Sequence, residues 1–409
     1  METALSTPPG VMSATQGRQV ALHDAERELR RAWMAADDEV RRARGEGMLR
    51  LRETNLVIYA TAEADAARAR AAAARLMRVH PGRVVLLTPQ AQAASGGDPE
   101  AFISTACFQD EESGRQICSE EVVIRGTEET RALQAVVLQL LVPDLPVVTW
   151  WLGDLQTSWL DLSWLAEASD QLIVDVDSSG DAAQGLQTLD EMLRSHRGRA
   201  RPFFRELNWL RTAPWRKLIA ELFESPERRR LLADIDRLVV EHDSAFSQAL
   251  LFGAWFGVRL GFARVEGDWQ RDDAGWHARL QAVPSGAPVP ARSLVLELRR
   301  VAKGAEATPG LVGASVHTSQ PSLAEDVAEG QVLYLRRRPH SYSCIACVAG
   351  SLAESTVKAL ELPQDEDWAL LSAVLESPAP DRVFEEALGV AADLASLPGI
   401  AGPREDPGP

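Results

Sequence analysis

Two aspartates, Asp175 and Asp177, are the carboxylates of this sequence best placed to do chemistry. They end the run QLIVDVD, whose apolar residues are typical of a buried strand. In α/β proteins, ligands often bind beyond the carboxyl ends of such strands, and strand alternation predicts that both side chains share one face. A capping role is nevertheless favoured, because aspartates accept backbone hydrogen bonds from a following turn and helix, here the segment SSGDAAQ.

Cys344 and Cys347 have the C-x-x-C spacing of a redox pair. They lie in SYSCIACVAG, which is typical of a strand, and residues three apart on a strand point to opposite faces. Two separate buried thiols are therefore favoured over a redox pair. Together with Cys107 and Cys118 they are too few for a disulfide framework in a chain of 409 residues.

The sequence lacks the motifs of a nucleotide-binding site, a zinc site and a hydrolase active site. The first predicted strand is followed by TAEADAARA, which contains no phosphate-binding glycine, and no Walker loop occurs. The seven His residues do not fall at zinc-binding spacings. His242, Asp243 and Ser244 contain the residue types of a hydrolase triad, but no G-x-S-x-G turn accompanies them. The sequence therefore assigns no catalytic residue, no metal site and no cofactor.

Tryptophan and arginine alternate in the segment ELNWLRTAPWRKL, which contains Trp209, Arg211, Trp215 and Arg216. These residue types are common at the centres of protein interfaces, since they combine a large contact area with directional hydrogen bonds. They are equally able to fill a core where the chain enters a helix. The four residues are candidates for a partner interface, with the core as the open alternative.

The elements that must position these residues begin with a strand, helix and strand at Thr54–Ala60, 63–78 and 83–88. This order predicts a right-handed crossover in a parallel sheet. Trp150 and Trp151 lie in another predicted strand and are expected in the core, one on each side of the sheet. Further strands are predicted at 101–108, 117–124, 146–151 and 172–177, with helices at 128–141, 159–168, 182–194 and 215–223.

The rest of the chain has a different pattern. Short runs of alternating residues separated by Gly, Pro and Asp predict strands at 276–282, 293–301, 311–317, 332–336 and 343–348. An amphipathic helix is expected over 20–44, docked on its own domain. The predicted fold class is an open doubly wound, mostly parallel α/β domain followed by a smaller α+β, mainly antiparallel domain. The expected divisions are 1–45 (flexible N-terminus and helix), 46–225, 226–362 and 363–409 (helical and flexible tail).

The net charge limits the possible partners, and the apolar runs of the sequence bear on its compartment. The formal net charge of −16 repels phosphate backbones and anionic lipid surfaces, so neither a nucleic acid nor a membrane is expected as a partner. No cationic start precedes an apolar core at the N-terminus, and no apolar run approaches the roughly 20 residues of a membrane span. A cytoplasmic location is expected.

Three short motifs occur in a characteristic order: PDLPVVTWW at 143–151, LIVD at 172–175 and LNWLRTAPWR at 207–216. With RVHPGRVVLL at 78–87, this order resembles the glucose-6-phosphate dehydrogenase assembly protein family, also called OpcA. Ala213 and Val176 depart from the family's "TPWR" and "IVDS" patterns. The similarity extends from about residue 54 to residue 350 and is dense between 78 and 223.

The resemblance implies a protein of carbohydrate metabolism that is not an enzyme. Members bind glucose-6-phosphate dehydrogenase and raise its activity in the oxidative pentose phosphate pathway, so the implied role is assembly factor and allosteric activator acting by protein–protein interaction. The implied partner is that dehydrogenase. The alternative is an α/β protein that binds a sugar phosphate at the strand ends around Gly153 and Asp175, with Arg201, Arg205 or Arg211 as the anion partner.

Overall fold

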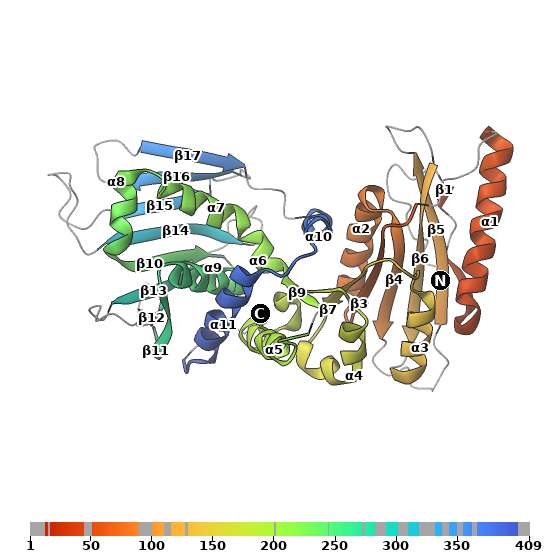
Figure 1. Cartoon of the computed structure of the whole chain (residues 1–409), viewed down its shortest axis with the longest axis horizontal. Coiled ribbons are helices and arrows are strands. Elements are labelled where there is room, and N and C mark those ends of the chain that lie inside the picture. The colour runs from red at the N-terminus through yellow and green to blue at the C-terminus, as the bar shows by residue number, and fades with distance from the viewer. Residues whose placement is uncertain are drawn as a thin grey trace, which may run out of the picture. The chain divides into compact units, whose positions relative to one another are not determined.

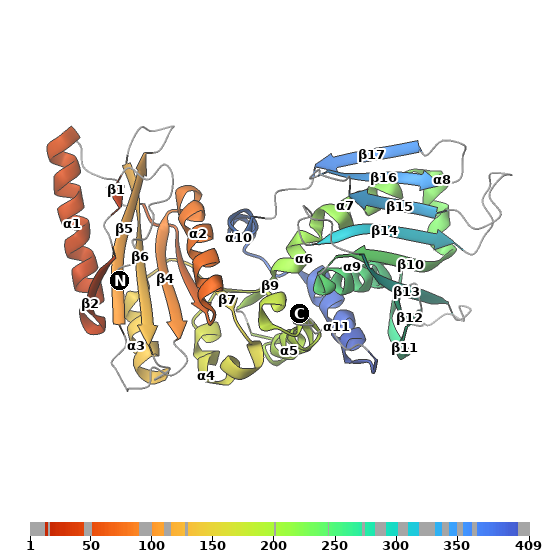
Figure 2. The ribbon, with the colours of Figure 1, turned by 180° about the vertical axis from the view of Figure 1, so that it is seen from behind.

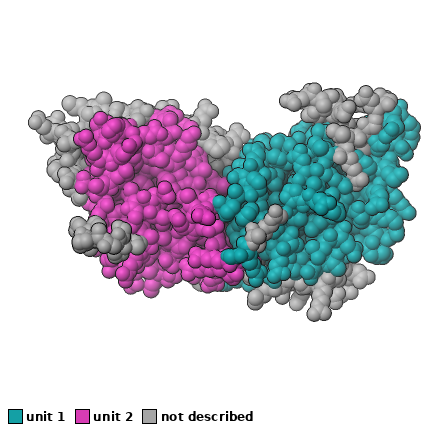
Figure 3. Space-filling model, viewed as in Figure 1, with its two compact units in different colours: residues 1–178, 198–205, 366–380 teal, residues 179–197, 206–365, 381–409 magenta. Residues whose placement is uncertain are grey.

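The computed structural model (Figure 1) describes residues 13–14, 17–44, 51–89, 100–109, 116–126, 130–199, 202–243, 245–271, 275–282, 292–301, 310–318, 332–337, 343–349, 355–361 and 366–399. The chain divides into two compact units, each assembled from three segments (Figure 3). Unit 1 contains residues 1–178, 198–205 and 366–380, and unit 2 contains residues 179–197, 206–365 and 381–409. The four-part division expected from the sequence stays a prediction.

The centre of unit 1 is the predicted parallel sheet. Strand β3 (Thr54–Ala60) pairs in parallel with β4 (Gly82–Pro89) on one side and with β7 (Val147–Leu152) on the other. Helix α2 (Glu63–Val79) makes the crossover between β3 and β4, as expected. Parallel pairing continues from β4 to β6 (Gln116–Gly126) and from β7 to β8 (Gln171–Val174), so the chain winds in both directions from β3.

Apolar side chains fill both faces of these parallel strands. Trp150 and Trp151 on β7 have no exposed surface, which confirms their predicted place in the core. The ring of Trp151 lies 4.7 Å from that of Tyr59 on β3, and the guanidinium of Arg68 on α2 lies 5.9 Å from the Trp150 ring. Because neighbouring strand residues point to opposite faces, the tryptophan pair fills space on both sides of the sheet.

One edge of this sheet is antiparallel. Strand β5 (Glu100–Gln109) pairs with β6 and is joined on its other side by β1 (Ser13–Ala14) and β2 (Arg18–Ala21). The helix was expected to begin at Val20, but Val20 and Ala21 belong to this edge strand, and helix α1 begins only at Ala25 (Ala25–Arg44). Ala25, Leu29 and Trp33 of α1 are buried, which confirms that the helix docks on its own domain.

Shorter elements complete unit 1. Their bounds are α3 Thr130–Leu140, α4 Leu155–Glu167, β9 Phe203–Glu206 next to β8, and α10 Asp367–Glu376. Helix α10 belongs to unit 1 although it comes late in the chain. There the guanidinium of Arg75 on α2 lies 4.7 Å from the ring of Trp368, and His80 hydrogen-bonds with Ser372 over 2.9 Å. Arg205 at the end of unit 1's second segment donates to the carbonyl oxygen of Ser377.

Unit 2 is built on the predicted, mainly antiparallel sheet. Its strand order is β11-β12-β13-β10-β14-β15-β16-β17, and among these pairs only β10 and β13 run in parallel. The bounds are β10 Ile235–His242, β11 Phe262–Arg271, β12 Trp276–Ala282, β13 Ser293–Arg300, β14 Leu311–Thr318, β15 Val332–Arg337, β16 Ser343–Ala349 and β17 Ser355–Glu361. Strands β9, β11 and β17 were not predicted. The two units together confirm the predicted fold class.

Helices cover one face of the unit 2 sheet, and the opposite face is turned to the viewer in Figure 2. Helix α9 (Phe246–Arg259) packs on the strands through glycines: a Cβ at Gly253 would lie 2.6 Å from Leu296, and one at Gly257 would lie 2.7 Å from Leu280. The remaining helices are α5 Ala182–Ser195, α6 Leu207–Arg211, α7 Ala213–Leu222, α8 Pro226–Arg229 and α11 Arg382–Ser396. Helix α11 packs on both α5 and α9.

No helix within the ranges given above is both long enough and apolar enough to cross a membrane.

Candidate functional site

The tryptophan and arginine motif forms a corner between two short helices of unit 2. Glu206 ends strand β9 and starts helix α6: its buried carboxylate accepts hydrogen bonds from the backbone N–H of Trp209 over 2.6 Å and from the Asn208 side chain over 2.9 Å. Thr212 separates α6 from α7 and donates to the carbonyl oxygen of Trp209. Pro214 lies in the first turn of α7, where its missing N–H costs nothing.

Trp209 fastens helix α11 to this corner. Its indole N–H donates to Asp381 Oδ2 over 2.9 Å, and its ring packs on Phe384 with centroids 5.6 Å apart. The other oxygen of Asp381 accepts from the backbone N–H of Phe384 and so caps the first turn of α11. Trp209 and Trp215 are each 2% exposed. Both indoles therefore stabilise the interior of unit 2, and little of either reaches the surface.

Arg216 stacks on the same tryptophan. Its guanidinium carbon lies 3.2 Å from the centroid of the Trp209 ring, and Nη1 donates to the carbonyl oxygen of Trp209 and to Thr212 Oγ1, each over 2.8 Å. Burial lowers the pKa of Arg216 to about 9, although the charge of Asp381 opposes this change. The side chain remains partly exposed, so it is the most accessible part of the stack.

Arg211 belongs to a second network at the same corner. Its Nη1 donates to Asn208 Oδ1 over 2.8 Å, and the side chain of Gln248 in the first turn of α9 donates to the same oxygen over 3.2 Å. Asn208 and Gln248 are buried, whereas Arg211 is partly exposed. The structure thus brings the four predicted interface residues into one corner, with two arginines toward the surface and two tryptophans inside. Their contact with a partner stays a prediction.

The strand-end carboxylates are separated by the structure. Strand β8 ends at Val174, Asp175 is buried behind it, and Asp177 is exposed in the short 3-10 turn Val176–Ser179. The shared face expected from alternation therefore does not form, because the strand stops before the first aspartate. The N-cap of α5 is Asp181, which accepts from the backbone N–H of Gln184, and a capping role for Asp175 or Asp177 in the turn before this helix stays a prediction.

Asp175 is held inside unit 1 by an arginine. Arg68 Nη2 donates to Asp175 over 2.7 Å and to Asp367 over 2.9 Å, and its Nε donates to Asp367 over 2.5 Å. Burial works to lower the pKa of Arg68, but the hydrogen bonds and charges of Asp367 and Asp175 outweigh it and raise that pKa. Burial also raises the pKa of nearby Asp65, an effect that Arg68 opposes.

The anion partners of the sugar-phosphate alternative are largely engaged. Arg205 is buried and donates to backbone carbonyls of residues 377 and 379, so it fastens the chain after α10. A Cβ at Gly153 would lie 2.9 Å from the Thr61 side chain, which accounts for the glycine by packing alone. Arg201 lies outside the described residues. Within the described ranges, no group of three or more His, Cys, Asp or Glu side chains is arranged to hold a metal ion.

The C-x-x-C cysteines lie on strand β16, as predicted. Cys344 is a buried thiol whose sulfur lies 3.8 Å from the carbonyl oxygen of Ile345. Cys347 pairs with Tyr334 on one neighbouring strand and with Thr356 on the other, and its side chain lies outside the described residues. Their proposed roles, as separate thiols or as a redox pair, stay predictions.

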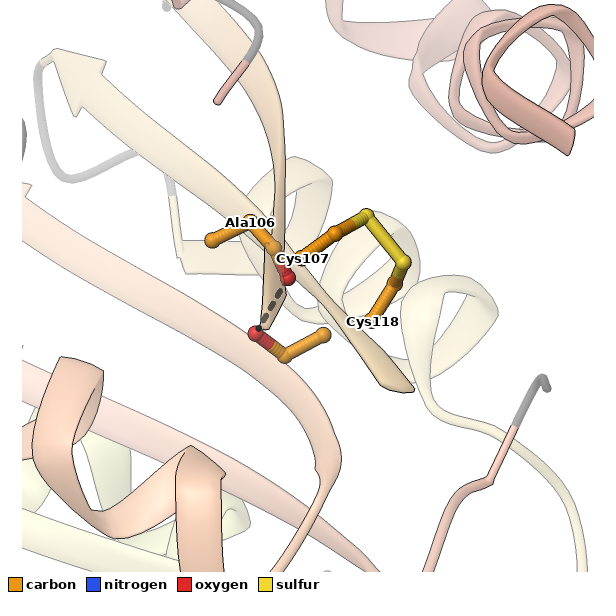
Figure 4. Close-up of a disulfide and its surroundings, with 4 residues drawn as sticks. Ala106, Cys107 and Cys118 are labelled. Carbon is orange, nitrogen blue, oxygen red and sulfur yellow. Dashed lines mark hydrogen bonds between the residues drawn. A yellow bond between two sulfur atoms is a disulfide. The ribbon is translucent and has the colours of Figure 1, made fainter. Parts of the chain in front are cut away.

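A disulfide joins Cys107 and Cys118 instead (Figure 4). The two cysteines face each other directly across the antiparallel pair β5 and β6, with Cα atoms 4.1 Å apart. Trp33 of α1 belongs to the same buried cluster. The cysteine count was used only to judge whether a framework of several disulfides could hold the whole chain. It therefore missed this single local bond. The two strands were predicted, but their antiparallel pairing and the register that places the cysteines opposite each other were not.

Reduction of the Cys107–Cys118 disulfide is expected to lower the free energy of unfolding by about 2–3 kcal/mol, because the bond closes a short loop in the unfolded chain. Urea unfolding with and without a reductant measures the difference. A Cys107→Ser, Cys118→Ser double variant is the control and should not respond to the reductant. Equal unfolding midpoints for the oxidised and reduced wild type would contradict the expectation.

The fold and these contacts define a class of two-unit proteins. One unit has a doubly wound, mostly parallel sheet, and the other is an α+β unit in which the Trp and Arg motif contacts helices of the same unit. Residues 73–191 match the family described as glucose-6-phosphate dehydrogenase subunit N-terminal domain, and residues 202–388 match the corresponding C-terminal domain. The chain belongs to this family, OpcA, as its ordered motifs indicated.

Two relatives carry the name OxPP cycle protein OpcA. The protein of Nostoc punctiforme is 26% identical over 336 residues, which cover 78% of this chain and 66% of that protein. The protein of Synechocystis sp. is 28% identical over 222 residues, which cover 54% of this chain and 45% of that protein. The matched stretches thus span about two thirds of one relative and less than half of the other.

Among solved structures, an NAD binding oxidoreductase from Klebsiella pneumoniae covers 84% of this chain and 96% of its own, with 14% identity and a TM-score of 0.47. A dehydrogenase from Clostridium difficile covers 83% of this chain and 97% of its own, with 9% identity and a TM-score of 0.41. At these scores neither likeness carries an argument about this chain.

Proposed function

We propose that this chain is a non-catalytic assembly factor and allosteric activator of glucose-6-phosphate dehydrogenase in the oxidative pentose phosphate pathway, and that it acts in the cytoplasm. The observation that carries the proposal is the match of both family domains in sequence, covering residues 73–191 and 202–388. Asp175 and Arg205 are residues that the sugar-phosphate alternative would use to hold its ligand. Both already form hydrogen bonds within the protein, and this adds support to the proposal.

The mechanism of such an activator is a shift between states of its partner. A protein that binds the competent dehydrogenase oligomer more tightly than the inactive form increases the population of the competent form. Its effect on substrate affinity cannot exceed its own difference in affinity for the two states. This chain then needs no catalytic group of its own, only a surface that distinguishes the two states.

Addition of the purified protein to the dehydrogenase of the same organism is expected to lower the half-saturating glucose-6-phosphate concentration, or raise the maximal rate, by about fivefold or more, a usual size for coupling between sites. Cofactor reduction followed across substrate concentrations measures both quantities, and size-exclusion chromatography tests for a complex. Heat-denatured protein is the control. Unchanged kinetics together with separate elution of the two proteins would contradict the proposal.

A further inference from the structure

The guanidinium of Arg216 has one bonded side and one open side. Nη1 bonds to Trp209 and Thr212, and the plane of the group rests on the Trp209 ring. Nε and Nη2 make no hydrogen bond to any other residue of the described chain. The side chain is only partly buried, and neither nitrogen is among the fully buried side-chain atoms of the described chain that lack a partner, so this edge keeps some contact with solvent.

Three other sequestered arginines of the described chain have carboxylate partners, whereas the buried Arg205 donates to backbone carbonyl oxygens. Arg83 binds Glu120 and Glu26, Arg70 binds Glu121, and Arg68 binds Asp175 and Asp367. For Arg216, no carboxylate oxygen lies within ion-pair distance among the described residues. The contact with the Trp209 ring and the two hydrogen bonds of Nη1 use one side of this cation, so the other side remains available for a counter-charge.

A structural role would need only the bonded side. One donor at Nη1 suffices to hold the corner between α6 and α7, and a neutral side chain could supply it. The open edge carries two parallel N–H groups, and this fork matches the two oxygens of a carboxylate. Because the ring of Trp209 fixes the plane of the fork, an incoming carboxylate would meet donors that are already oriented.

We propose that the open edge of Arg216 binds a carboxylate of the partner protein, from an Asp or Glu side chain, in a two-point ion pair. This inference rests on the proposed function and adds to it the kind of contact and the residue that makes it. Trp209 and Thr212 are positioning residues, because they act by holding the guanidinium. Burial lowers the pKa of Arg216 and the charge of Asp381 offsets this only in part, which agrees with a cation that has no carboxylate in direct contact.

The test compares Arg216→Gln with Lys217→Gln. Lys217 is the exposed neighbour on the same helix, so both variants lose one positive charge from the same surface. Glutamine at position 216 keeps a donor for the Trp209 carbonyl. Unfolding midpoints and near-ultraviolet circular dichroism of the tryptophans check that each variant is folded, and Arg216→Lys, which keeps the charge without the fork, is the second variant if glutamine disturbs the corner.

The dissociation constant of the complex with the dehydrogenase is expected to rise at least about tenfold for Arg216→Gln and to stay within about twofold for Lys217→Gln, since the loss of a charged hydrogen-bonded pair weakens binding by such factors. Arg216→Lys is expected to weaken binding by an intermediate factor. If the wild-type protein binds and Arg216→Gln binds as tightly as Lys217→Gln, the carboxylate contact is overturned while the proposed function stands.

A second measurement uses this protein alone and does not depend on the dehydrogenase. The thermal unfolding midpoint is followed in sodium acetate and in sodium phosphate, with ionic strength held constant by chloride. A rise with acetate in the wild type but not in Arg216→Gln supports a carboxylate site even if the dehydrogenase fails to bind. A rise with phosphate alone would overturn the proposal in favour of a free phosphate ligand, and no Arg216-dependent rise with either anion, without dehydrogenase binding, would overturn it outright.

Discussion

Replacement of Arg83 by methionine is expected to lower the free energy of unfolding by about 3–5 kcal/mol, the usual cost of removing one partner from a buried ion pair. Arg83 and Glu120 lie on neighbouring parallel strands, β4 and β6, and each is 2% exposed. Arg83 Nε donates to Glu120 Oε2 over 2.9 Å, and Nη2 lies 2.7 Å from the same oxygen.

The loss is large because the substitution leaves several groups without their partner. Arg83 Nη1 also donates to Glu26 on α1 over 2.7 Å and to the carbonyl oxygen of Leu140 at the end of α3. Methionine has a similar length but no donor, so the Glu120 carboxylate would lose its contacts with Arg83 while its ion pair with Arg52 remains. A buried charge with too few donors costs more than the apolar side chain returns.

Urea unfolding followed by tryptophan fluorescence measures this effect. Arg41→Met is the matched control, because Arg41 forms an exposed pair with Asp37 and its replacement should leave the unfolding midpoint unchanged. Adding Glu120→Gln to Arg83→Met should restore part of the loss, since it removes a buried charge that has lost its contacts with Arg83. A loss of less than about 1 kcal/mol in the single variant would refute the expectation for buried pairs.

Stability is expected to fall between pH 6.5 and pH 4 because of His242. This residue ends strand β10 and is 4% exposed. Burial lowers the pKa of His242 from its ordinary 6.5 to about 4; the charge of Asp243 opposes the shift and that of Arg300 adds to it. The ring of Phe246, at the start of α9, lies 6.2 Å away and contributes apolar surroundings.

The sign follows from where the proton binds. Below pH 6.5 the unfolded chain protonates this imidazole while the folded chain does not, so proton binding stabilises the unfolded state relative to the folded state. Stability is therefore fully present above pH 6.5 and is lost as pH falls toward 4. The full difference of about 2.5 pKa units corresponds to roughly 3 kcal/mol.

Comparison with His242→Asn isolates this contribution. Unfolding free energies of both proteins are measured at pH 7.5 and at pH 4.5, and the variant is expected to lose less stability between these values. Hydrogen exchange of the β10 amides provides a local measurement in the same unit. Parallel pH profiles for the two proteins would show that His242 does not sense acid in this way.

The elements of the parallel sheet could be predicted from the sequence because their signals are local. Residues 54–60 are an uninterrupted apolar run, and the Ala-rich stretch after residue 63 has helical periodicity, so β3 and α2 follow from short-range pattern. Strands β11 and β17 were missed because they lack such local signals. Their exposed positions carry polar residues without clear alternation, and they are strands because neighbouring strands offer hydrogen bonds.

The candidate site could be predicted only in part. The order of Trp209, Arg211, Trp215 and Arg216 along the chain indicated the family and a special corner, but it left core and interface open. Burial decided the matter for the tryptophans, and burial depends on Phe384 and Asp381, which lie far along the chain on α11. The pairing of Asp175 with Arg68 was likewise invisible from the neighbours of either residue.

The sequence by itself determined the family, the alternation of strands and helices in the first unit, and the mainly antiparallel character of the second. These properties depend on residues close together in the chain, whose spacing sets which face is apolar. The tertiary structure alone decided which charges are paired, which cysteines are joined, and that Arg216 keeps an open edge. The physical reason is that the interaction partner of a side chain, or the lack of one, is set by contacts between segments that are distant in sequence. The residues of one such segment do not indicate which other segment it will contact.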